Sequence, residues 1–100
     1  MANDLACKLT TLELRRRRET VIAELRSHIR NREETADGCI YTLPATADTI
    51  GQVTSFIESE RQCCEFFSFR LSVPSGSSEI HLEISGPQGA KEFLKEELGL

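Results

Sequence analysis

Two adjacent cysteines, Cys63 and Cys64, are the residues of this sequence best suited to chemistry, and Cys7 is a third candidate. Thiolate sulfur is both a nucleophile and a ligand for soft metals. The pair lies in the segment Glu60-Arg61-Gln62-Cys63-Cys64-Glu65-Phe66-Phe67, where a predicted helix gives way to a predicted strand. The fourth cysteine, Cys39, falls in an alternating apolar run and is predicted to be a small core residue.

The surroundings of these thiols differ in charge. Cys63 and Cys64 are expected at a helix C-terminus, where the helix dipole disfavours thiolate, and Glu60 and Glu65 act in the same direction. Cys7 lies three residues before the predicted N-cap of the first helix, with Lys8 beside it and the arginine run nearby, so its thiolate is favoured. A bound cation would reverse the balance at the pair, because coordination deprotonates a thiol.

Three thiolates suit a soft metal or metalloid, such as mercury or copper(I), better than zinc. Structural zinc sites have four ligands at C-x-x-C or H-x-x-x-H spacing, and neither pattern occurs here. His28 and His81 are isolated in the sequence and are expected not to be ligands. Adjacent side chains of a regular helix diverge by about 100°, so we predict that the helix breaks at or between Cys63 and Cys64. We also predict that Cys7 lies within ~8 Å of one of their sulfur atoms, close enough to share an ion.

Two other interpretations of the cysteines remain open. The chain could be a thiol-dependent redox or transfer enzyme in which Cys7 is the nucleophile and the pair Cys63/Cys64 resolves it. The absence of a C-x-x-C motif and of a histidine placed as a base favours a protein that is not an enzyme. Alternatively the cysteines only pack, in a structural or partner-binding domain that forms a homodimer through its sheet.

Length and charge exclude several classes of protein. One hundred residues make a single domain, residues 1–100, and the net charge of −4 argues against nucleic acid as a partner. No apolar run reaches the roughly 18 residues of a membrane span, and the N-terminal sequence lacks the features of a signal peptide. We therefore expect a cytoplasmic protein whose thiols are kept reduced.

Three helices are expected to position these residues. The first covers about residues 11–32, with a capping box from Thr10 to Glu13 and apolar residues at a helical period. The run Arg15-Arg16-Arg17-Arg18 spreads around the helix and is expected to be solvated. The second helix covers residues 46–64 and the third covers residues 87–98.

Three strands are expected between these helices, over residues 38–43, 67–73 and 80–85, because apolar and polar residues alternate there. The order α-β-α-β-β-α predicts an α+β domain with a three-stranded, mainly antiparallel sheet. Its split β-α-β arrangement has strand order 1-3-2, with the helices packed on one face. The other face is a candidate dimer surface.

The chain resembles a group of small, uncharacterised bacterial proteins. The resemblance covers nearly the full length and rests on three motifs: Ala6-Cys7-Lys8-Leu9, the segment 60–67 that holds the cysteine pair, and 86–94, which reads Gly-Pro-x-Gly-x-x-x-Phe-Leu. Such proteins often accompany heavy-metal handling systems, including mercury resistance, which implies soft-metal binding by Cys7, Cys63 and Cys64. Two positions depart from the pattern: Glu65 stands where proline is frequent, and Cys39 where an aromatic residue is expected.

Overall fold

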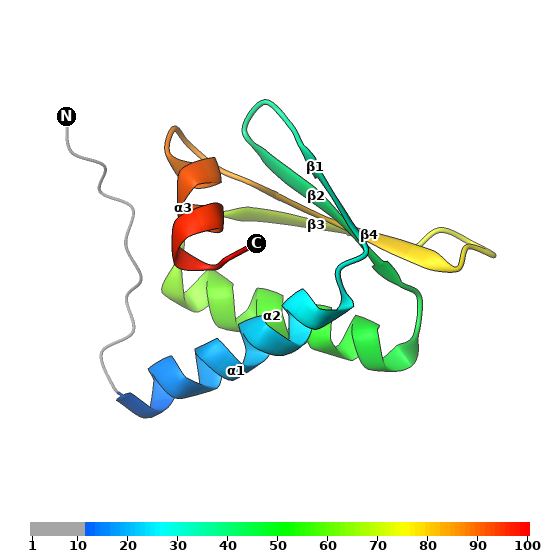
Figure 1. Cartoon of the computed structure of the whole chain (residues 1–100), viewed down its shortest axis with the longest axis horizontal. Helices are drawn as coiled ribbons and strands as arrows, with labels where there is room; N and C mark the ends of the chain where they lie inside the picture. The colour runs from blue at the N-terminus through cyan, green and yellow to red at the C-terminus, as the bar shows by residue number, and fades with distance from the viewer. Residues whose placement is uncertain (1–11) are drawn as a thin grey trace.

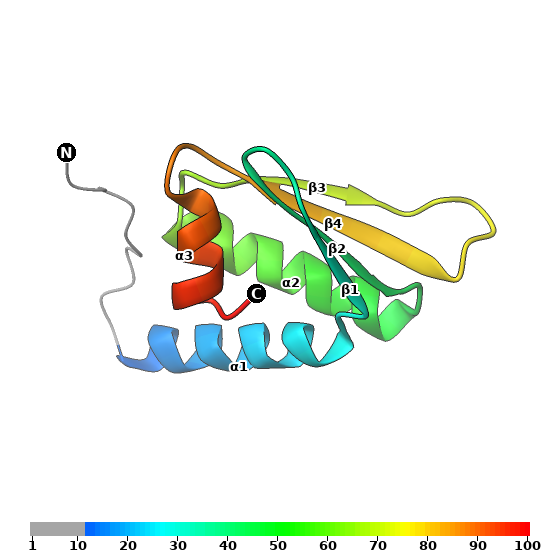
Figure 2. The same ribbon diagram turned by 45° about the horizontal axis from the view of Figure 1, so that its top comes forward.

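The computed structural model describes residues 12–100, which form three helices and four strands. The helices are α1 (Leu12–His28), α2 (Ala47–Cys63) and α3 (Ala90–Glu97). The strands are β1 (Asn31–Glu34), β2 (Gly38–Pro44), β3 (Ser68–Ser72) and β4 (Glu79–Ser85). All three helices lie on the same side of the sheet (Figures 1 and 2). This confirms the α+β class and a two-layer arrangement.

The sheet is antiparallel throughout, with strand order β1-β2-β4-β3. Strand β4 lies between β2 and β3, as the split arrangement predicts for these three strands. Tyr41 is opposite Leu82, and Leu71 is opposite Leu82 on the other side of β4. This register aligns the apolar side chains of the three strands on the face that the helices cover.

The prediction of three strands was wrong, because residues 31–34 form a fourth strand, β1, at the sheet edge. We expected helix until residue 32, yet α1 ends at His28 and the chain pairs with β2 instead. The segment Asn-Arg-Glu-Glu is exposed at all four positions and has no apolar alternation, so its sequence does not indicate a strand. A hydrogen bond from the Arg30 N–H to the Thr42 carbonyl (2.7 Å) extends the pairing of β1 with β2. The Glu34 carboxylate also forms an ion pair with Lys95 of α3 (3.0 Å).

The helices begin and end within a few residues of their expected bounds. Thr46 caps α2, and its hydroxyl accepts a hydrogen bond from the Thr49 N–H at 3.1 Å. Helix α3 begins at Ala90 rather than Pro87, because residues 87–89 form a turn in which the Pro87 carbonyl accepts a hydrogen bond from the Ala90 N–H.

Helix α1 runs antiparallel to α2 in both views, which brings its first turns beside the end of α2 (Figures 1 and 2).

The core lies between the sheet and the helices. Its largest members with no exposed surface are aromatic and aliphatic side chains from every layer: Leu25, Tyr41, Leu43, Phe56, Ile80, Leu82, Ile84 and Leu94. Cys39 also has no exposed surface, which confirms its assignment to the core. No helix within residues 12–100 has the length and apolar character of a membrane span.

Candidate functional site

The cysteine pair lies where α2 stops. Cys63 is the last helical residue, and Cys64 is the C-cap with φ −121° and ψ 79°, outside the helical range. The Cys64 N–H still donates to the Glu60 carbonyl (2.6 Å), and the Cys64 carbonyl accepts from the Phe67 N–H (3.2 Å). The predicted break in the helix is therefore confirmed, and it frees Cys64 from the 100° divergence of helical neighbours.

Leaving the helix brings the two sulfur atoms together. Cys64 Sγ lies 3.6 Å from Cys63 Sγ, and its S–H donates toward that sulfur. Neither residue has exposed surface. Cys64 is a free thiol, whereas Cys63 is disulfide-bonded. The pair is thus a buried thiol next to an oxidised sulfur.

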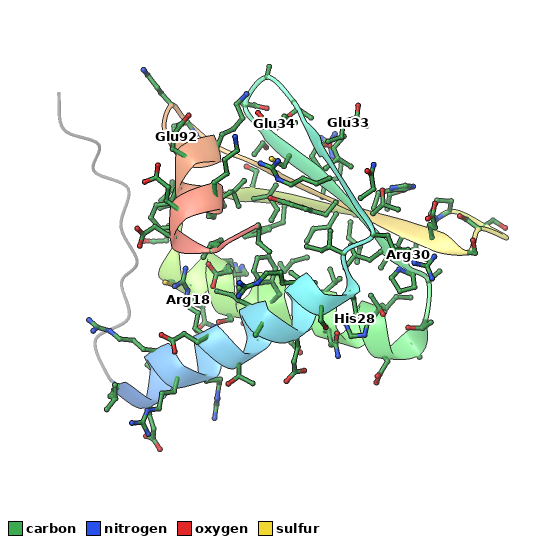
Figure 3. All side chains as sticks on the ribbon, viewed as in Figure 1. Arg18, His28, Arg30, Glu33, Glu34 and Glu92 are labelled. Atoms are coloured by element: carbon green, nitrogen blue, oxygen red, sulfur yellow. The ribbon has the colours of Figure 1, made fainter. Side chains whose placement is uncertain are left out.

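A buried ion pair from two helices lies against this sulfur pair. The Arg18 guanidinium donates to both carboxylate oxygens of Glu60, from Nε at 2.7 Å and from Nη2 at 3.0 Å. The Glu60 side chain is 0% exposed and that of Arg18 is 13% exposed. Arg18 Nη2 also lies 3.8 Å from Cys64 Sγ. Figure 3 shows Arg18 directed from α1 toward α2. We call Arg18, Glu60, Cys63 and Cys64 the thiol site.

The charges of the thiol site keep Cys64 protonated. Burial, followed by the negative charge of Glu60, raises the pKa of the Cys64 thiol to about 12, although Arg18 acts to lower it. Burial also acts to lower the pKa of the Arg18 guanidinium, but the hydrogen bond and charge of Glu60 outweigh it and raise that pKa above its ordinary value. The expectation that Glu60 disfavours thiolate at the pair is therefore confirmed.

Neither Arg18 nor Glu60 was expected to be buried, although the sequence contains the signal. Arg18 precedes Ile22 by four residues and Leu25 by seven, which places it on the buried side of α1. Glu60 follows Phe56 by four residues and Val53 by seven, on the buried side of α2. One charge on each buried face is the pattern that an interhelical ion pair requires.

The apolar faces of both helices differ in detail from the prediction. In α2 the fully buried positions include Val53, Phe56 and Cys63, while Ile50 and Ile57 are only half-buried. Cys63, rather than Cys64, therefore continues the buried face of the helix. In α1 the buried residues are Ile22 and Leu25, whereas Leu14, which shares their helical period and was expected to be buried with them, is 44% exposed.

The other candidate residues are placed as follows. Cys7 lies outside the described residues, so its predicted distance to the pair stays a prediction. The Arg61 side chain is 65% exposed and lies 3.9 Å from that of Glu58. His28 contacts the carbonyl of Glu24 through Nδ1 at 2.9 Å. No group of three or more histidine, cysteine or acidic side chains in residues 12–100 is arranged to hold a metal ion.

Aromatic rings cover the chain that leaves the thiol site. The centroids of Phe66 and Phe67 are 4.5 Å apart, and Phe93 of α3 lies 5.1 Å from Phe66 and 5.8 Å from Phe67. Phe69 lies 6.0 Å from Phe56 and from Phe67. These contacts join the end of α2 to the sheet and to α3, so the sulfur pair is held in an apolar surrounding on this side.

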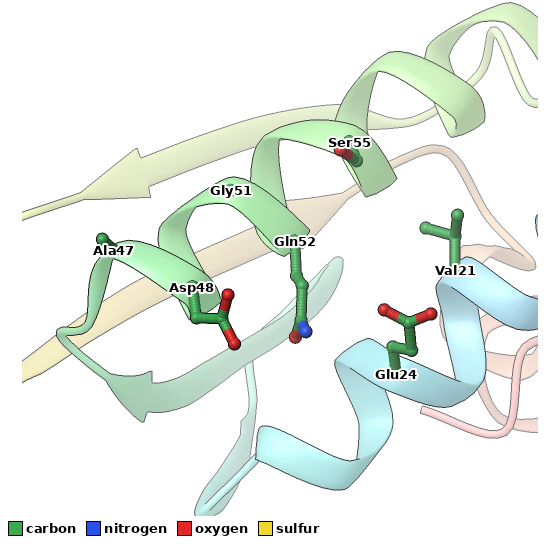
Figure 4. Close-up of a pocket in the computed structure, with 7 residues that line it drawn as sticks. All are labelled: Val21, Glu24, Ala47, Asp48, Gly51, Gln52 and Ser55. Atoms are coloured by element: carbon green, nitrogen blue, oxygen red, sulfur yellow. The ribbon is translucent and has the colours of Figure 1, made fainter.

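A surface groove follows the outer side of α1 and α2, away from the sulfur atoms. One part has a volume of about 530 Å³ (Figure 4). Its lining combines small or apolar residues with acceptors: Val21, Glu24, Ala47, Asp48, Gly51, Gln52 and Ser55. The Oε1 atom of Gln52 is buried without a hydrogen-bond partner. The sequence patterns gave no indication of this groove.

Comparison of the chain with protein-family models, with curated proteins and with solved structures finds no match in any of the three.

Proposed function

We propose that this chain is a thiol-based binding protein for a soft metal or metalloid, such as Hg(II) or Cu(I), and that it acts in the cytoplasm as a carrier, buffer or sensor accessory. The observation that carries the proposal is the separation of 3.6 Å between Cys63 Sγ and Cys64 Sγ. Two sulfur ligands at about 2.3 Å from one metal ion lie roughly 4 Å apart, so this pair needs little movement to share an ion.

Electrostatics support the same assignment. Two thiolates with one Cu(I) ion carry a net negative charge, and a buried negative charge needs a cation nearby. Arg18 Nη2, 3.8 Å from Cys64 Sγ, is a permanent cation at that position, and the Glu60 carboxylate shares it. Because coordination removes the thiol proton, metal binding should release protons and strengthen as the pH rises.

Cys63 must be reduced before it can bind a metal, because it is disulfide-bonded in this structure. The proposal therefore concerns the reduced protein, with Cys7 as the third sulfur ligand. The resemblance to proteins associated with heavy-metal handling supports this choice of ligands.

A competition titration tests the proposal. The fully reduced protein is titrated with Hg(II) or Cu(I) in the presence of glutathione, and the bound metal is followed by its thiolate charge-transfer absorbance. We expect binding tighter than that of glutathione, and loss of that advantage in Cys63→Ser and in Cys64→Ser. Cys39→Ser is the matched control, since Cys39 is a buried free thiol on β2. An affinity equal to that of glutathione, or an equal loss in the control, would contradict the proposal.

The oxidised state of Cys63 favours a second candidate function, thiol-dependent redox or transfer chemistry that uses Cys7. In this scheme the Cys64 sulfur, after losing its proton, attacks Cys63 Sγ and forms a Cys63–Cys64 disulfide. The former partner of Cys63 leaves as a thiolate and takes up the proton, so no external oxidant or reductant is consumed. In this scheme Cys7 is the thiol that leaves.

Alkylation rates against pH separate the two functions. An enzyme of this kind needs a thiol with an apparent pKa below the free value of about 8.5, and Cys7 is the candidate. If no thiol of the reduced protein titrates below that value, the enzyme proposal fails while the metal proposal stands.

A further inference from the structure

We propose that the β3 edge of the sheet is a self-association surface, through which two copies of this chain join their sheets in a symmetric antiparallel pair. Within the described residues β3 is the outermost strand on its side, and β4 is its only partner there. Figure 2 shows β3 at the margin of the sheet opposite to β1.

The two edges of the sheet differ in their protection. An exposed edge strand invites pairing, and proteins discourage it with short strands and charged side chains. Strand β1 has both devices, with four residues, three of them charged, and all four exposed. Strand β3 has a single charge, Arg70, between Phe69 and Leu71. Only β3 is therefore suited to receive another strand.

Apolar side chains at this edge are incompletely covered by their own chain. Phe69 and Leu71 point to the helical side of the sheet, yet both are only half-buried. Val73, two residues further on the same face, is 52% exposed. It precedes Pro74, which restricts Val73 to an extended backbone that can continue the strand. A strand added beside β3 would cover all three.

The occupant that fits best is a second copy of β3, because the strand is complementary to itself in one register. A two-fold axis at Leu71 places Leu71 opposite Leu71, Phe69 opposite Val73, and Arg70 opposite Ser72. This register pairs apolar residues on the helical side and puts a small hydroxyl opposite each guanidinium. A register centred on Arg70 would instead place two like charges opposite each other, which is unfavourable. A strand pair of this length belongs among weak, concentration-dependent interfaces.

Charge changes at Ser72 test the register without disturbing the fold, because Ser72 and Arg70 are both exposed in the single chain. We measure the dimer dissociation constant of the full chain by sedimentation equilibrium. Ser72→Glu would face Arg70 twice across the two-fold axis and should tighten the dimer by about 2- to 30-fold, the effect of two cross-strand charge pairs. Ser72→Arg should weaken the dimer by a similar factor, because it would place two like charges opposite each other on each side of the axis.

Ser68→Arg is the matched control. Ser68 lies on the same strand and the same face as Ser72, but in this register it falls opposite Pro74 and not opposite Arg70. We expect no change in its dissociation constant. A protein that stays monomeric at all accessible concentrations would overturn the proposal. A dimer that does not respond to either change at Ser72, or that responds equally to Ser68→Arg, would overturn it too.

Discussion

Replacing Arg18 by methionine tests whether the ion pair with Glu60 holds α1 against α2. The substitution removes the guanidinium but keeps most of the apolar stem. Glu60 would then lose two hydrogen bonds, of 2.7 and 3.0 Å, on a side chain that is 0% exposed. A buried carboxylate without its partner is costly, because neither water nor another charge replaces the lost interactions.

The expected loss is large for a domain of this size. Removing one partner of a buried ion pair destabilises proteins by about 3–5 kcal/mol. Total stabilities of single domains are about 5–15 kcal/mol. We therefore expect Arg18→Met to lose roughly a fifth or more of the free energy of unfolding, and to lower the melting temperature by at least about 12 °C.

Urea denaturation followed by circular dichroism at neutral pH measures this loss, with both proteins in the same oxidation state. Arg17→Met is the control, because Arg17 is exposed on the same helix and should change the free energy of unfolding by no more than about 0.5 kcal/mol. The double variant Arg18→Met/Glu60→Leu should regain much of the loss, because it leaves no unpaired charge. If Arg18→Met matches the control, or if the losses at the two positions simply add, the ion pair does not have the function assigned to it here.

Three further predictions follow from single contacts. Gly38→Ala should destabilise the fold by about 1–3 kcal/mol or more, because an added Cβ would overlap the Ile84 carbonyl on the neighbouring strand; equal urea midpoints for variant and wild type would contradict this. Thr46→Ala should lower the free energy of unfolding by about 0.5–2 kcal/mol, because it removes the acceptor for the Thr49 N–H at the start of α2; a smaller loss than in Thr54→Ala, an exposed position of the same helix, would count against the cap. Native Cys64 should be alkylated slowly near neutral pH, at a rate that keeps rising with pH beyond the free thiol value of about 8.5, because its pKa is raised to about 12; mass spectrometry that finds a plateau near the free value would refute the shift.

Local patterns in the sequence were enough for most of the fold. Alternating apolar residues predicted β2, β3 and β4, and the split β-α-β arrangement predicted that β4 lies in the middle. The need to bring two neighbouring side chains together predicted that the helix breaks at or between Cys63 and Cys64, and α2 ends at Cys63. In each case the physical cause acts between residues that are close in the chain, so the sequence pattern carries it.

Tertiary contacts alone decided the rest. The segment 31–34 has no apolar pattern, and it becomes a strand because β2 offers a hydrogen-bonding edge and Lys95 pairs with Glu34. Helical spacing to Ile22 and Leu25 places Arg18, alone among the four consecutive arginines at residues 15–18, on the buried side of α1. Its pairing with Glu60 comes only from the contact of α1 with α2. Which acidic side chain pairs with Arg18 depends on the relative placement of two helices whose contacting residues, Arg18 and Glu60, are 42 residues apart in the chain, and no local periodicity specifies that placement.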